Sequence, residues 1–123
     1  MCMDYAKRMR NLRKSKISSL HIAVCLDYIY DHLHTHITAE QLAKLTGLNI
    51  SYLSRLFKKE TGQSFVSYLT DYRMDRAEEM VLNTDEKSYK IAEKVGYQDA
   101  NYFSYVFKKK FGVSPSKYRA SGK

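Results

Sequence analysis

Apolar residues recur along this chain at three- and four-residue intervals, the spacing of helices that bury one face. Between residues 49 and 62 the apolar stripe consists of Leu53, Leu56 and Phe57. The same spacing in residues 64–82 joins Phe65, Tyr68, Leu69, Tyr72, Ala77, Met80 and Val81. In residues 18–34 it joins Leu20, Ala23, Val24, Tyr28 and Leu33. We therefore expect three helices that bury these side chains.

Capping residues mark where the helices begin and end. Thr38 followed by Gln41 forms a capping box, and Gly47 is a helix stop. Further N-caps are expected at Asn49, Ser88 and Asp99, and further stops at Gly62, Gly96 and Gly112. Pro115 fits the first turn of a last short helix. With one Pro, five Gly and few β-rich runs, the chain is expected to be all-α.

One segment of the chain recurs after about 50 residues. Residues 52–62 read Tyr-Leu-Ser-Arg-Leu-Phe-Lys-Lys-Glu-Thr-Gly, and residues 102–112 read Tyr-Phe-Ser-Tyr-Val-Phe-Lys-Lys-Lys-Phe-Gly. The match continues to Ser64 and Tyr68, which correspond to Ser114 and Tyr118. Upstream, Leu42 corresponds to Ile91, so the turn of the second copy contains one extra residue. Each copy predicts a helix, a short turn and a second helix, which is a helix-turn-helix.

The repeat divides the chain into segments. We expect a first helix-turn-helix at about residues 37–62, a connecting helix at about 64–82, a second helix-turn-helix at about 88–112 and a final helix at about 114–120. Together these segments form one domain over residues 18–121. Residues 1–17 have weak periodicity and are interpreted as a basic linker or the remnant of a preceding domain. A continuous connecting helix would fix the separation of the two units, which a flexible linker could not do.

The charge of the chain indicates a polyanionic partner. The formal net charge is +8 at a sequence pI of about 9.5, which fits nucleic acid or an anionic membrane surface. Residues 1–17 and 88–123 are basic, whereas residues 63–87 are net acidic. No apolar run approaches the ~18 residues that span a bilayer, and no secretory leader is evident, so a cytoplasmic protein is expected.

The second helix of a helix-turn-helix lies in the major groove of DNA, and its polar side chains fit that role here. Arg55 can form two hydrogen bonds with guanine, and Asn101 can do so with adenine. Ser51, Ser54 and Ser104 are short donors or acceptors. The cations suited to phosphates are Lys58, Lys59, Lys108, Lys109 and Lys110.

These residues resemble the C-terminal DNA-binding domain of the AraC/XylS family of bacterial transcriptional regulators. The similarity lies in residues 52–62, in Tyr72-Arg73, in Ile91-Ala92-Glu93-Lys94-Val95-Gly96-Tyr97 and in Asn101-Tyr102-Phe103-Ser104, and it continues through Phe107-Lys108-Lys109, Phe111-Gly112, Ser114-Pro115 and Tyr118-Arg119. The resemblance implies about seven helices and two helix-turn-helix units in successive major grooves. It implies base contacts by Ser51, Ser54, Arg55, Asn101 and Tyr105. We also expect Tyr52, Tyr102 and Arg119 to contact phosphates, together with the five lysines.

The resemblance also implies a wider setting for the domain. The expected DNA is a double-stranded promoter, and the expected protein partner is RNA polymerase. The usual effect of family members is to activate transcription, and they act in the bacterial cytoplasm at the nucleoid. Many members carry a separate sensory or dimerisation domain, which we expect to be missing from this chain. Tyr105 stands where some relatives carry Arg, so the second unit is open to an alternative role as an anchor on the DNA backbone.

Other functions have weaker support in the sequence. His32, His34 and His36 alternate, which on a helix spreads the imidazoles around the axis, so no metal site is expected. The chain has no recognisable nucleophile–base set and no Gly-rich phosphate loop, so no enzyme activity or cofactor is expected. Cys25 is expected in the core, and Glu78 and Glu79 in solvent. A non-specific nucleic-acid-binding module remains the alternative function, because it would share the charge.

Overall fold

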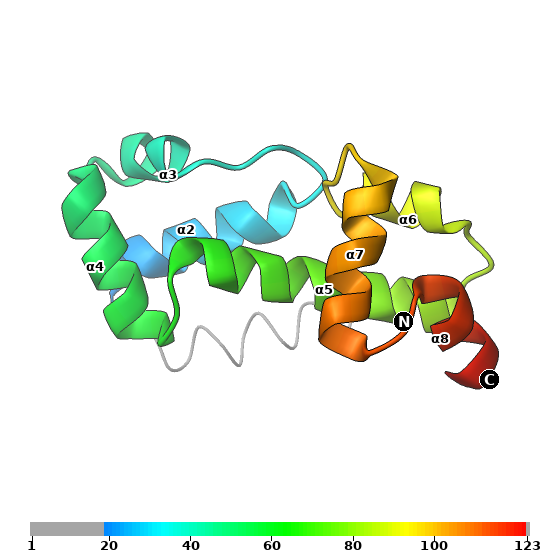
Figure 1. Cartoon of the computed structure of the whole chain (residues 1–123). Helices are drawn as coiled ribbons and strands as arrows, with labels where there is room; N and C mark the ends of the chain where they lie inside the picture. Colours follow the sequence, from blue (N-terminus) through cyan, green and yellow to red (C-terminus); the bar gives the residue numbers. More distant parts are fainter. Residues whose placement is uncertain (1–18, 123) are drawn as a thin grey trace. The chain divides into compact units, whose positions relative to one another are not determined.

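The computed structural model describes residues 19–122, so the predictions for residues 1–17 lie outside the described residues. Within residues 19–122 the chain forms seven helices and no strand (Figure 1). They are α2 (Leu20–Asp31), α3 (Ala39–Thr46), α4 (Ile50–Thr61), α5 (Phe65–Asn83), α6 (Ser88–Lys94), α7 (Ala100–Phe111) and α8 (Pro115–Gly122). The predicted all-α class and the number of helices are confirmed.

The helices belong to two compact units. The described part of unit 1 consists of residues 19–32 and 37–69, and that of unit 2 consists of residues 33–36 and 70–122. The boundary between the units falls inside α5, whose first residues belong to unit 1 and whose remainder belongs to unit 2. Each unit therefore contains one complete helix-turn-helix, α3–α4 in unit 1 and α6–α7 in unit 2.

The core of unit 1 is built mainly from α2 and α4. Its buried side chains on α2 are Ile22, Cys25, Leu26 and Ile29. Leu42 of α3, Leu53 and Phe57 of α4 and Tyr68 of α5 are also buried. The predicted face of α2 was wrong, because Leu20 is 78% exposed and Val24 is 37% exposed. Both stripes have helical spacing, and packing against α3 and α4 selects the one at positions i, i+3, i+4 and i+7.

The core of unit 2 joins α5, α6 and α7. The buried cluster consists of Met74, Ala77, Val81, Ile91, Ala92, Val95, Phe103 and Phe107. Phe103 and Phe107 are fully buried on one face of α7, as the helical spacing predicted. Truncating a buried Phe to Ala typically costs ~3–5 kcal/mol, so these two rings are major determinants of the position of α7.

The helix starts follow local rules with one exception. In the capping box of α3, the Thr38 backbone N–H donates to Gln41 Oε1 at 2.9 Å and the Gln41 N–H donates to Thr38 Oγ1 at 3.2 Å. The prediction that Ser88 caps α6 was wrong. Ser88 is the first residue of that helix, and Lys87 occupies the N-cap position without a side-chain cap bond. The Lys87 carbonyl instead accepts from the N–H groups of Lys90 and Ile91.

A buried arginine fixes a chain segment and a turn within unit 2. Arg73 of α5 is 8% exposed. Its Nη2 donates to the Thr35 carbonyl at 2.7 Å, and its Nη1 donates to the Gly96 carbonyl at 3.2 Å. Its guanidinium also lies over the Tyr97 ring, 5.6 Å from the centroid. Arg73 therefore holds residues 33–36 and the turn of the second helix-turn-helix against α5.

Candidate nucleic-acid interface

The two expected recognition helices, α4 and α7, begin in the same way. Each has 12 residues and an acidic or amide side chain at its N-cap. Asn49 Oδ1 accepts from the backbone N–H groups of the second and third helical residues at 2.9 and 3.2 Å. Asp99 Oδ1 accepts from the corresponding groups of α7 at the same two distances. Both caps confirm the N-terminal signals in the sequence.

The two helices also end in the same way. The N–H of Gly62 donates to the Lys58 carbonyl at 2.8 Å, and the N–H of Gly112 donates to the Lys108 carbonyl at 2.7 Å. The next tyrosine after each stop packs edge-on against a buried phenylalanine at the equivalent position of the recognition helix. The centroid separation is 5.5 Å both for Tyr68 on Phe57 and for Tyr118 on Phe107. The internal repeat of the sequence thus corresponds to equivalent hydrogen bonds and ring contacts in the two units.

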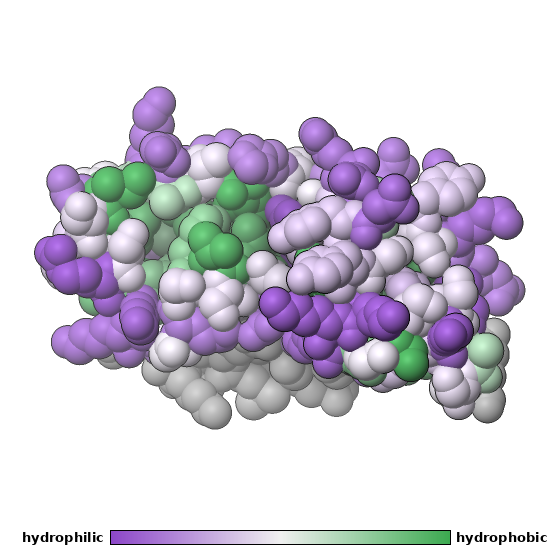
Figure 2. Space-filling model, viewed as in Figure 1, coloured by the Kyte–Doolittle hydropathy of each residue, from purple (hydrophilic) through white to green (hydrophobic). Residues whose placement is uncertain are grey.

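The face of α4 opposite its buried side chains is polar and exposed. Leu53 and Phe57 fill the inner face. Figure 2 shows hydrophilic side chains over the outer part of α4. The exposed residues of α4 include all of those predicted to contact DNA, which are Ser51, Tyr52, Ser54, Arg55, Lys58 and Lys59. Helix geometry brings these six side chains onto one continuous surface.

The outer face of α7 differs because Tyr105 stands at the position that Arg55 occupies on α4. Asn101, Tyr102 and Tyr105 are exposed, whereas Ser104 is half-buried. Tyr102 is 55% exposed and Tyr105 is 61% exposed. Figure 2 shows pale side chains of intermediate hydropathy over α7, beside strongly hydrophilic ones. The predicted contact residues of α7 therefore form a second surface with an aromatic centre.

The lysines at the end of α7 are not equivalent. Lys108 and Lys109 are exposed, and among residues 19–122 no ion pair joins either of them to a carboxylate. Lys110 Nζ instead lies 3.0 Å from Asp75 Oδ1 and 3.6 Å from Asp71 Oδ1. A phosphate would have to compete with two carboxylates for Lys110, whereas Lys108 and Lys109 face solvent.

Arg119, predicted to contact phosphate, is partly committed to the fold. Its Nε donates to the Val81 carbonyl at 2.8 Å, and the Arg119 side chain is half-buried. This bond ties α8 to the end of α5 within unit 2. Arg119 therefore has a structural partner of its own, unlike Lys108 and Lys109 of α7.

The prediction that Glu78 and Glu79 are solvated was wrong. Glu78 Oε2 accepts from the Tyr118 hydroxyl at 2.5 Å, which joins α5 to α8 and raises the pKa of Tyr118. Glu79 pairs with Arg76 one turn earlier on α5. The neighbours of these carboxylates come from α8 and from the helix itself, so adjacency in the sequence gave no indication of them.

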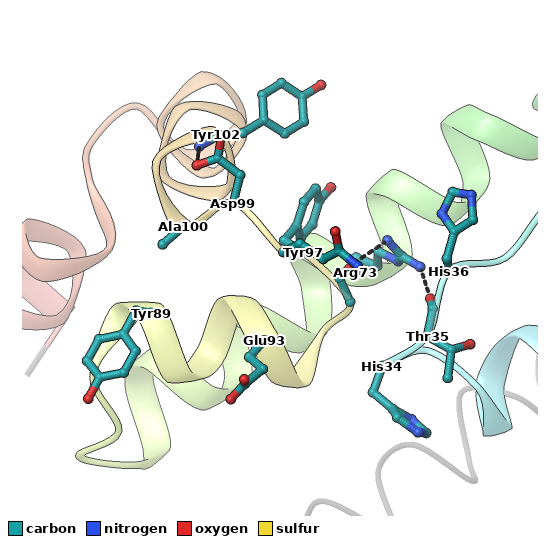
Figure 3. Close-up of a pocket in the computed structure, with 12 residues that line it drawn as sticks. His34, Thr35, His36, Arg73, Tyr89, Glu93, Tyr97, Asp99, Ala100 and Tyr102 are labelled. Atoms are coloured by element: carbon teal, nitrogen blue, oxygen red, sulfur yellow. Dashed lines mark hydrogen bonds between the residues drawn. The ribbon is translucent and has the colours of Figure 1, made fainter.

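A cleft of about 960 Å³ lies in unit 2, beside the start of α7 (Figure 3). Its lining includes His34, His36, Arg73, Tyr97 and Tyr102. No structural role was predicted for Arg73 from the sequence, although a cation between the buried residues of a helix is a usable signal of one. Burial lowers the pKa of Arg73. Because both Nη atoms are bonded to carbonyls, the guanidinium acts mainly as a structural clamp.

The alternating histidines belong to different units. In unit 1, His32 stacks on Tyr28 with ring centroids 4.0 Å apart. In unit 2, His34 and His36 line the cleft. The described part of the chain has no group of three or more His, Cys, Asp or Glu side chains that could hold a metal ion. None of its helices is long and apolar enough to cross a membrane.

Proteins that resemble this chain in sequence include regulators of transcription. Residues 42–121 match the family model described as a helix-turn-helix domain. The multiple antibiotic resistance protein MarA of Salmonella typhimurium is 32% identical over 94 residues, covering 76% of this chain and 74% of MarA. The lactose operon transcription activator of Staphylococcus xylosus is 39% identical over 94 residues, covering 76% of this chain and 34% of the activator.

A solved structure agrees with these relatives. The C-terminal domain of AraT, a response regulator from Geobacillus stearothermophilus, is 40% identical and has a TM-score of 0.80, with coverage of 84% of this chain and 86% of that domain. The chain spans less than half the length of the first curated relatives that it matches. Proteins of this family and fold are DNA-binding regulators rather than enzymes. The chain belongs to the AraC-type helix-turn-helix family of DNA-binding transcription regulators.

Proposed function

We propose that this chain binds double-stranded DNA in a sequence-specific manner, with α4 and α7 in successive major grooves. The observation that carries the proposal is the matched construction of two helices that each bury one apolar face and expose the opposite face. The major groove admits one α-helix, and successive grooves on one side of the duplex are about 34 Å apart. One chain with two such helices can read a two-part site.

In this proposal α4 reads bases through Arg55, Ser51 and Ser54. Arg55 is exposed, lies opposite the buried face of α4 and can donate two parallel hydrogen bonds to O6 and N7 of guanine. The serine hydroxyls donate or accept and so tolerate more than one base. This half of the site is expected to contain a guanine that is strongly preferred.

The helix α7 reads bases through Asn101 and Tyr105. The phosphate contacts that cost least are those of exposed cations, which are Lys58, Lys59, Lys108 and Lys109. Tyr52 and Tyr102 are exposed, and their hydroxyls add neutral donors. Lys110 and Arg119 would contact phosphate only by sharing or exchanging the partners that they have in the protein.

For the whole protein we propose regulation at promoters inside a bacterial cell. The name of one relative, the lactose operon transcription activator of Staphylococcus xylosus, supports a regulator that activates transcription. In this proposal the protein activates transcription by contacting RNA polymerase. Because the chain spans less than half of its first curated relatives, we propose that an effector or dimerisation domain accompanies this one in the full protein.

The test is selection from a random duplex library, followed by titration of the selected site by fluorescence anisotropy. Specific binding is expected to be at least ~10³-fold tighter than binding to scrambled duplex at physiological salt. Two variants separate the role of the Arg55 fork from that of its charge. Arg55→Ala removes both, whereas Arg55→Lys keeps the charge and loses the fork.

We expect Arg55→Ala to lose the preference for guanine at one position, at a cost of ~1–3 kcal/mol, and Arg55→Lys to keep a weaker preference there. Lys87→Ala removes one exposed positive charge elsewhere and serves as the control. An unchanged base preference in Arg55→Ala would remove Arg55 from the reading set. Equal binding of all duplexes would favour the alternative, a non-specific nucleic-acid-binding module.

A further inference from the structure

The outer face of α7 carries a ladder of aromatic rings. The Tyr102 and Tyr105 rings stack with centroids 6.2 Å apart and an angle of 28° between their planes. More than half of each residue is exposed. The two rings lie between Asn101 near the start of the helix and Lys108 and Lys109 near its end. An apolar surface thus occupies the centre of a face whose two ends are polar.

The ring of Tyr102 packs against the side chain of Tyr97, which is itself held in place. The Tyr97 ring lies 6.0 Å from the Tyr102 ring and 5.7 Å from the ring of Phe103, which is fully buried. The Arg73 guanidinium lies over Tyr97 and is itself bonded to two backbone carbonyls. Figure 3 shows Tyr97 between Arg73 and Tyr102. The exposed rings therefore pack on side chains that are already held in place. Because of this packing, the tyrosine side chains lose little conformational entropy when a partner covers them.

The matching position on α4 shows what is unusual about α7. Tyr52 of α4 corresponds to Tyr102, whereas Arg55 corresponds to Tyr105. A tyrosine ring has no pair of donors that fits O6 and N7 of guanine, so the chemistry at this position changes from hydrogen bonding to apolar contact. Among the groups at base edges in the major groove, the C5 methyl of thymine is the apolar one.

From this arrangement we infer that α7 reads thymine, by packing the C5 methyl against the rings of Tyr105 and Tyr102. The inference rests on the proposed function, because it requires that α7 enter a major groove. It assigns different chemistry to the two halves of the site. The α4 half contains a guanine read by hydrogen bonds, and the α7 half contains one or two thymines read by their methyl groups.

The experiment replaces each thymine of the selected site, one at a time, with deoxyuridine. This change removes the C5 methyl and leaves base pairing intact. We expect about fourfold weaker binding at one or two thymines of a single half-site, the effect of losing one buried carbon. Tyr105→Ala is expected to abolish that sensitivity, whereas Tyr105→Phe, which keeps the ring, is expected to retain it. Arg55→Ala, on the other helix, should also retain it.

The outcomes separate this inference from the proposed function. A selected site at which every deoxyuridine substitution is neutral would overturn the thymine reading and leave specific binding in place. Sensitivity that persists in both Tyr105→Ala and Tyr102→Ala would also overturn it, because the methyl would then be sensed elsewhere. Tighter binding to single strands than to duplex would mean that the rings stack on unpaired bases. Failure to select any site would overturn the proposed function, and the inference with it.

Discussion

Substitution of Gly96 by alanine tests how closely residues 33–36 pack against the turn of the second helix-turn-helix. Gly96 has a φ of +96°, in the left-handed region that side chains rarely adopt. A Cβ atom at Gly96 would lie 2.4 Å from the Leu33 carbonyl oxygen and 2.7 Å from Arg73 Cζ. The oxygen belongs to the backbone, so the segment or the turn must move and disturb the hydrogen bonds of Arg73.

Gly112 provides a matched control. Its φ is +89°, and a Cβ added there would meet nothing within 4 Å. Gly112→Ala should therefore cost only the backbone strain, roughly 1–2 kcal/mol. Gly96→Ala adds an overlap and at least one disturbed bond of a buried arginine, at about 1–3 kcal/mol for a group left unsatisfied. We expect a total near 3–5 kcal/mol for Gly96→Ala, which is large for a single substitution.

The assay is urea denaturation of both variants, followed by circular dichroism and by tyrosine fluorescence, since the chain has 11 Tyr and no Trp. The free energy of unfolding follows from the midpoint and the slope. Equal midpoints for the two variants would show that Leu33 and Arg73 do not press against Gly96. A second check is Arg73→Met, which should relieve part of the additional cost of Gly96→Ala.

Three further predictions concern single residues. Lys109→Ala should weaken binding to all duplexes about equally and lower the slope of log affinity against log salt concentration by about 1. Lys110→Ala should lower that slope by less, because Asp75 already pairs with Lys110. Equal slopes for the two variants would refute this. Asp99→Ala should destabilise unit 2 by ~0.5–2 kcal/mol through loss of the N-cap of α7, and no change in the urea midpoint would count against the cap. Burial raises the pKa of Cys25 from 9.0 to about 11, so unfolding should become easier as pH rises through that range, because the unfolded thiol ionises first. Cys25→Ala should lack this part of the pH dependence, and identical profiles for the variant and the parent would contradict the assignment.

Features set by local chemistry could be predicted from the sequence. The caps at Asn49 and Asp99 depend on side chains two and three residues from the N–H groups that they satisfy, so spacing alone indicates them. The repeat places Tyr68 and Tyr118 on equivalent phenylalanines because both copies have the same spacing. The division into a linker, a domain and its parts at the stated residues stays a prediction.

Features set by distant contacts could not be predicted. The buried face of α2 depends on which of two helical stripes meets α3 and α4. Arg73 bonds to carbonyls 38 and 23 residues away in the sequence, which no local pattern encodes. The same holds for Lys110, whose carboxylate partner Asp75 is 35 residues away, and it separates this lysine from Lys108 and Lys109. The relative strength of the proposed phosphate contacts therefore follows from the structure and not from charge alone.

The spacing between the two halves of the DNA site tests the central claim most directly. Five base pairs inserted between the selected half-sites turn one half to the opposite side of the duplex, since a full turn is about 10–10.5 base pairs. If α4 and α7 occupy successive major grooves, anisotropy titration should show affinity falling to that of one half-site alone. Unchanged affinity after the insertion would contradict simultaneous binding by the two helices.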